Sequence, residues 1–147
     1  MRFRSKKIRA KITFVMMSRW FGKKPAPLAG APAVRRQKTY SAQSGYVYQY
    51  FYEGHRPSSG NRGTDYVFAV SSDRKTSWPV AVIISDAAVA SWQNKSGRTL
   101  SATEQYAIAK MALFQAFDER ESPEAMRQPV RVAPLDVQTI LAALHID

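Results

Sequence analysis

The stretch YVYQYFYE, residues 46–53, decides how the fold begins. Its four tyrosines alternate with other side chains, and aromatic or β-branched residues at a period of two are typical of a β-strand. Residues 54–63 follow with three glycines, one proline and two serines, which predicts a long hairpin loop. Two more apolar runs, residues 64–71 and 79–84, have a short polar turn between them. Three such runs in succession predict an antiparallel meander.

Helical patterns take over after the third run. Asp86 is a candidate N-cap for a short helix over residues 87–93. Residues 101–104 read SATE, a capping box that predicts the start of a long amphipathic helix against the sheet. Residues 130–132 can form a short edge strand, and Pro134 suits the first turn of a last helix. We therefore expect an α+β fold: a three-stranded antiparallel meander, or a four-stranded one with residues 130–132, followed by two to three helices packed on one face of the sheet.

The charge of the chain is unevenly distributed. The 147 residues contain 22 Lys and Arg against 11 Asp and Glu, a net charge of +11. Residues 1–43 hold twelve of the bases and no acid, so residues 44–147 hold ten bases and all eleven acids, a net charge of −1. Residues 22–43 are also rich in Gly, Pro, Ala and Ser, a composition typical of a linker. We divide the chain into a basic, disordered tail (1–43) and a single α+β domain (44–147) whose charge predicts no partner.

Several roles stay open for the tail. Its apolar run, residues 12–17, is too short for the core of a secretory signal and far below the roughly 20 residues that cross a bilayer. The basic amphipathic pattern is also seen in membrane-surface and organelle-targeting segments, and twelve bases predict salt-sensitive contact with nucleic acid. Met16 and Met17 are alternative initiation points, in which case residues 1–15 do not belong to the native protein. The default expectation is a cytoplasmic protein without a transmembrane segment.

The sequence contains no recognisable catalytic or metal-binding motif. Cysteine is absent, and the two histidines, His55 and His145, lack the spacing of metal ligands. No serine lies in a Gly-x-Ser-x-Gly elbow. We therefore assign no catalytic residue, no metal site and no cofactor, and enzyme activity is not the expected function.

Two groups of residues are candidates for ligand contact. Glycines in the predicted loop allow close approach of backbone N–H groups to an anion, and His55, Arg56 and Arg62 lie among them. Tyr48 and Tyr50 belong to the tyrosine row, which consists of Tyr46, Tyr48, Tyr50 and Tyr52 and forms either a stacking platform for bases or sugars or the buried side of the first strand. The sequence does not decide which face of the sheet is buried.

These observations support one leading hypothesis and two alternatives. The leading one is a small intracellular binding module of unassigned ligand, with a protein partner or a second copy of the chain as possible occupants. The first alternative is a nucleic-acid-associated protein that uses the basic tail for affinity. The second is a small enzyme that uses His55 and the loop arginines on an anionic substrate.

Overall fold

A computed structural model of the chain describes residues 25–146 and confirms the α+β class. The elements follow in the order β1 (Lys38–Ser41), β2 (Val47–Pro57), the 3-10 turn η1 (Ser59–Asn61), β3 (Gly63–Ser71), β4 (Trp78–Ser85), α1 (Asp86–Ser96), α2 (Ala102–Glu119), the 3-10 turn η2 (Ala125–Arg127), β5 (Val130–Val132) and α3 (Pro134–Ala143). No helix in this part of the chain is both long and apolar enough to traverse a bilayer. The roles considered for residues 1–24 lie outside the described residues.

The sheet has five strands in the order β1-β2-β3-β4-β5. The first four pair antiparallel, and β5 pairs parallel to β4, so the sheet is mixed and larger than the expected meander. The chain passes through α1 and α2 between β4 and β5, and such a crossover returns a strand in the same direction. Arg120 stabilises this connection because its guanidinium donates to the carbonyls of Ala125, Gln128 and Pro129.

β1 lies on the N-terminal side of the expected domain boundary at residue 44. Its sequence, KTYS, is polar and mostly exposed, so it lacks the apolar alternation that identifies a strand. It forms because the backbone turns back at Ala42, whose N–H donates to the carbonyl of Tyr46 and whose carbonyl accepts from Gly45. Upstream of it, Ala29 pairs with His55 and extends the contact of the N-terminal segment with β2.

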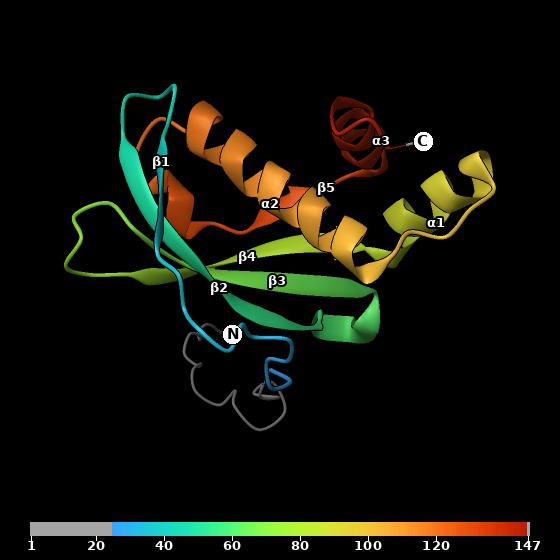
Figure 1. Cartoon of the computed structure of the whole chain (residues 1–147), viewed down its shortest axis with the longest axis horizontal. Helices are drawn as coiled ribbons and strands as arrows, with labels where there is room; N and C mark the ends of the chain where they lie inside the picture. Colours follow the sequence, from blue (N-terminus) through green and yellow to red (C-terminus); the bar gives the residue numbers. More distant parts are fainter. Residues whose placement is uncertain (1–24, 147) are drawn as a thin grey trace, which may run out of the picture.

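The helices cover one face of the sheet (Figure 1). The side chains of that face form the core with α2 and α3, and those that are almost completely buried include Tyr48, Phe68, Val80, Val82 and Ile84. α2 begins as predicted: the Ser101 hydroxyl accepts from the N–H of Glu104, and the Glu104 carboxylate accepts from the N–H of Ser101. α1 begins one residue earlier than predicted, since its N-cap is Ser85 and not Asp86.

The predicted loop over residues 54–63 is shorter in the structure. β2 continues through a bulge to Pro57, and only η1 and its flanks form the turn to β3. The bulge requires glycine at position 54, because Gly54 has a φ of +128° and a Cβ there would lie 2.6 Å from the carbonyl oxygen of Ala29. Glycine in this segment therefore signals a bulge within a strand as well as a turn.

Candidate functional site

The three candidates from the predicted loop do not lie in one cluster. His55 and Arg56 belong to β2, whereas Arg62 is exposed after η1. The imidazole of His55 lies over Gly30, and its ring centroid is 5.9 Å from that of Tyr66.

Arg56 is paired with a carboxylate. Its Nε lies 3.6 Å from Oδ2 of Asp65, whose Oδ1 accepts a hydrogen bond of 2.6 Å from the Ser58 hydroxyl. The charge of Arg56 is therefore balanced by Asp65 within the β2–β3 hairpin. Of the two loop arginines, Arg62 is the exposed one.

Tyr48 and Tyr50 face α2 and are buried, so these two tyrosines belong to the core side of the sheet. Tyr48 is 0% exposed, and its ring stacks on Phe117 at 4.4 Å with an interplanar angle of 9°. Tyr50 is 6% exposed and lines a pocket at the edge of the core.

That pocket lies where the N-terminal segment and β1 meet β2 and α2, and it has a volume of about 180 Å³. It is lined by Pro32, Val34, Arg36, Lys38, Tyr50, Phe51, Tyr52, Tyr106 and Lys110, and we call it the cationic pocket. Three of these residues are basic, three are tyrosines and none is acidic.

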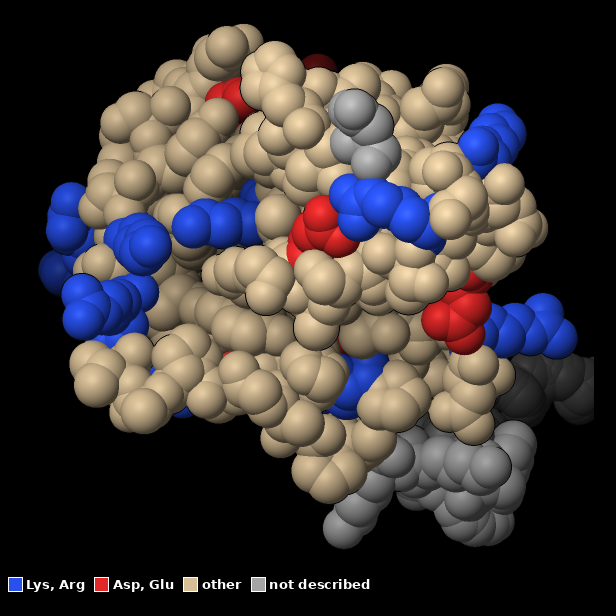
Figure 2. Space-filling model, turned by 45° about the vertical axis from the view of Figure 1, so that its right-hand side comes forward, with Lys and Arg blue, Asp and Glu red and all other residues tan. Residues whose placement is uncertain are grey.

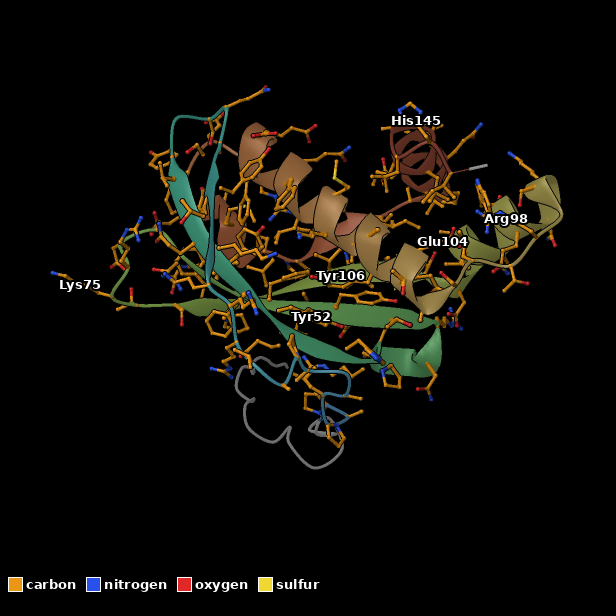
Figure 3. All side chains as sticks on the ribbon, in the orientation of Figure 1. Tyr52, Lys75, Arg98, Glu104, Tyr106 and His145 are labelled. Atoms are coloured by element: carbon orange, nitrogen blue, oxygen red, sulfur yellow. The ribbon has the colours of Figure 1, made fainter. Side chains whose placement is uncertain are left out.

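Regular secondary structure positions the side chains. Lys38 is the register partner of Tyr50, so β1 brings an ammonium group to the tyrosine row. Tyr106 and Lys110 lie four residues apart on α2 and so share one face of the helix. Figure 3 shows Tyr52 and Tyr106 between the sheet and α2, with ring centroids 4.7 Å apart.

The basic groups of the pocket are not neutralised by nearby acids. The ion pairs within residues 25–146 are made by Arg35, Arg56 and Arg98. Burial lowers the pKa of the Lys110 ammonium, and the nearby charge of Lys38 lowers it further. Figure 2 shows Lys and Arg side chains gathered on one side of the molecule, at the left of that view. The pocket therefore holds concentrated positive charge without a described counter-charge.

The tyrosine hydroxyls of the pocket remain protonated. Burial raises the pKa of Tyr50, Tyr52 and Tyr106, to about 12 in Tyr52. Within the described part of the chain, these three hydroxyls have no hydrogen-bond partner. Ammonium and guanidinium groups only donate, and a neutral phenol also donates. The polar side chains of the pocket thus present hydrogen-bond donors, the arrangement that an oxyanion needs.

Sequence reasoning identified Tyr50 of this site as a candidate residue, and Tyr52 as a further member of the tyrosine row. Arg36 and Lys38 were assigned to the linker, and Lys110 is 72 residues from Lys38 in the chain. A partial signal was present, because Tyr106 and Lys110 at a spacing of four place a phenol and an ammonium on one helix face. Their proximity to β1 depends on a strand that the sequence pattern does not reveal.

Asp118 and His145 lie outside the cationic pocket. The Asp118 carboxylate accepts from the Tyr40 hydroxyl and from the N–H of Gln43, which ties α2 to the β1–β2 turn. His145 is exposed after the end of α3 (Figure 3). Residues 25–146 contain no group of three or more His, Asp or Glu side chains placed to hold a metal ion.

No protein-family model, curated protein or solved structure matches this chain.

Proposed function

We propose that the domain is a binding module whose ligand carries a phosphate group held in the cationic pocket. The observation that carries the proposal is the convergence of Arg36, Lys38 and Lys110 on the edge of the tyrosine row without a described carboxylate partner. A phosphate monoester has a charge of about −1.5 to −2 and three strong acceptor oxygens, which matches several cations and phenol donors better than a carboxylate does.

The proposal also accounts for the energetic state of Lys110. Two ammonium groups close together repel each other, and partial burial of one adds a desolvation cost. A bound anion offsets both effects because its negative charge lies between or beside them. Phosphate binding should therefore raise the pKa of Lys110 and be accompanied by proton uptake in the alkaline range.

The volume of the pocket restricts the ligand. About 180 Å³ accommodates a phosphate with a small organic group, whereas the remainder of a larger ligand would extend into solvent. Pro32 and Val34 provide an apolar wall for that organic group. Phenyl phosphate is therefore a suitable probe beside inorganic phosphate.

The test is a titration of the full-length, isotopically labelled protein with phenyl phosphate, followed by amide chemical shifts. We expect saturable shifts at residues 36–38, 50–52 and 106–110. Lys110→Gln and Lys38→Gln should each weaken binding roughly tenfold, since each removes one charge-assisted contact. Lys95→Gln, on exposed α1, is the matched charge control and should not change the affinity.

A second pair of variants distinguishes the loss of a phenol donor in the pocket from a general effect of losing a tyrosine hydroxyl. Tyr52→Phe removes one donor from the pocket and should weaken binding a few-fold, whereas Tyr66→Phe removes a hydroxyl outside it and should not. The site would be refuted if Lys95→Gln and Lys110→Gln changed the affinity for phenyl phosphate equally. It would also be refuted if the amide chemical shifts did not reach saturation. A single-stranded oligonucleotide that competes with phenyl phosphate would place the phosphate in a nucleic acid.

A further inference from the structure

β2 also contains a buried polar side chain, that of Gln49, which does not line the cationic pocket. Gln49 is 3% exposed, and its side-chain oxygen Oε1 is buried without a hydrogen-bond partner. The side-chain amide of Gln49 makes no hydrogen bond with any other side chain or backbone group of residues 25–146. Buried amides are nearly always paired, so an unpaired one requires an explanation. Gln49 alternates with Tyr48 and Tyr50 along the strand and therefore points to the face of the sheet opposite the helices.

Gln49 lines a small pocket on that face. Its volume is about 140 Å³, and it is lined by Gln37, Gln49, Phe51, Ala69, Ser71, Arg74, Lys75, Thr76 and Ser77. We call it the amide pocket. It lies on the other side of β2 from the cationic pocket, and Phe51 lines both.

The turn between β3 and β4 forms the charged rim of the amide pocket. Asp73 shapes the turn because its Oδ1 accepts from the N–H groups of Lys75 and Thr76, both at 2.8 Å, and its Oδ2 accepts from the Thr76 hydroxyl. Arg74 adopts a left-handed conformation there, with a φ of 63°. The Asp73 carboxylate therefore accepts hydrogen bonds from its own turn, and it forms no ion pair with Arg74 or Lys75.

The two basic residues of the rim contribute differently. Neither Arg74 nor Lys75 is among the ion-paired residues of the described chain. Figure 3 shows Lys75 at the tip of the turn, directed away from the sheet. Arg74 is therefore the cation that we assign to direct contact, and the charge of Lys75 acts at longer range.

We propose that the amide pocket binds a small carboxylate that carries a hydrogen-bond donor beside its charge, a hydroxy acid being the simplest case. The carboxylate pairs with Arg74, and the adjacent hydroxyl donates to Oε1 of Gln49. A fully ionised phosphate presents only acceptors and would leave Oε1 unpaired, so this site differs in chemistry from the cationic pocket. The pocket volume restricts the ligand to a few non-hydrogen atoms.

The test uses two probes that differ only in the donor. Lactate has a hydroxyl beside its carboxylate, whereas propionate lacks the hydroxyl. Titration of the labelled, full-length protein should give saturable shifts with lactate at the side-chain amide of Gln49 and at the backbone of residues 71–76. Propionate should bind roughly tenfold more weakly because it cannot satisfy Oε1.

Two variants locate the contact. Gln49→Leu keeps a side chain of similar size without the polar atoms, and Arg74→Gln removes the charge on an exposed turn. Each should weaken lactate binding roughly tenfold, and Lys95→Gln should leave it unchanged. Gln49→Leu should not lower the unfolding midpoint, since it removes a buried polar group without a partner.

Three outcomes would overturn the proposal: equal affinity for lactate and propionate, no saturable shift with lactate, or unchanged lactate affinity in Arg74→Gln. If Gln49→Leu were to lower the unfolding midpoint, Arg74→Gln alone would decide the result, because its side chain is exposed and does not belong to the core.

Discussion

Removal of the Tyr48 hydroxyl should stabilise the protein. The ring of Tyr48 lies in the centre of the core, stacked on Phe117, but its hydroxyl is buried and has no hydrogen-bond partner in the described chain. Tyr48→Phe keeps the ring contacts and removes only the unpaired group. A matched variant is Tyr40→Phe, because the ring of Tyr40 stacks similarly on Phe114 at 4.5 Å while its hydroxyl donates to Asp118 at 2.8 Å.

The two substitutions should have opposite signs. An unpaired buried hydroxyl costs about 1–3 kcal/mol, so Tyr48→Phe should raise the free energy of unfolding by about 1 kcal/mol once the removed polar surface is discounted. Tyr40→Phe loses a hydrogen bond with a net value of about 1 kcal/mol. In Tyr40→Phe, the Asp118 carboxylate still accepts a hydrogen bond from the N–H of Gln43. The two variants should therefore differ by about 2 kcal/mol, or roughly 6–10 °C in unfolding temperature for a domain of this size.

Urea unfolding followed by tryptophan fluorescence and by far-UV circular dichroism measures both free energies. The dependence on urea should be the same in the two variants and the parent, since neither substitution changes the surface exposed on unfolding. If Tyr48→Phe destabilised the protein as much as Tyr40→Phe, the Tyr48 hydroxyl would have a partner, such as a buried water, and the reasoning would fail.

Two further predictions concern the backbone and the charged turns. Gly54→Ala should destabilise the protein by roughly 2–4 kcal/mol, because it combines a φ of +128° with a Cβ 2.6 Å from the carbonyl oxygen of Ala29. Gly45→Ala, which has a positive φ but no atom near the added Cβ, should cost less than half as much in the same urea experiment. Hydrogen bonds lower the pKa of Asp73 and of Glu104 to about 2, from 3.8 and 4.5, so their stabilising contribution is complete above pH 4.5 and is lost as the pH falls towards 2. The fall of the unfolding temperature between pH 5 and pH 2 should be smaller in Asp73→Asn and in Glu104→Gln than in the parent protein.

The strands and helices with strong local patterns were predictable from the sequence. The tyrosine row, the two apolar runs after it and the capping box at Ser101 each identify one element without knowledge of the rest. They agree with β2, β3, β4 and α2 to within a few residues, apart from the extension of β2 beyond Glu53. Each of these signals is local, and each describes a residue's immediate neighbours in the chain.

The elements that depend on distant partners were not predictable in the same way. β1 has no apolar alternation, and its pairing depends on a turn at Ala42. The extended character of residues 130–132 was visible, but the direction of pairing depends on the crossover through α1 and α2. The candidate site could not be predicted for the same reason, because Lys38 and Lys110 come together only when β1 pairs with β2.

The bulge in β2 connects the fold to the distribution of charge. Tyr52 pairs with Phe68 and Gly54 with Val67, so Glu53 is the extra residue and the alternation of faces changes phase there. His55 consequently comes to the face of the tyrosine row, beside Tyr66, and Arg56 comes opposite Asp65 on the other face. In a regular strand Arg56 would point towards the helices, where the pattern places buried apolar side chains. The bulge instead pairs Arg56 with a carboxylate, while Arg35 pairs with Glu53 at 2.8 Å. Arg36, Lys38 and Lys110 of the cationic pocket take part in none of the ion pairs found within residues 25–146 and can therefore contact a ligand.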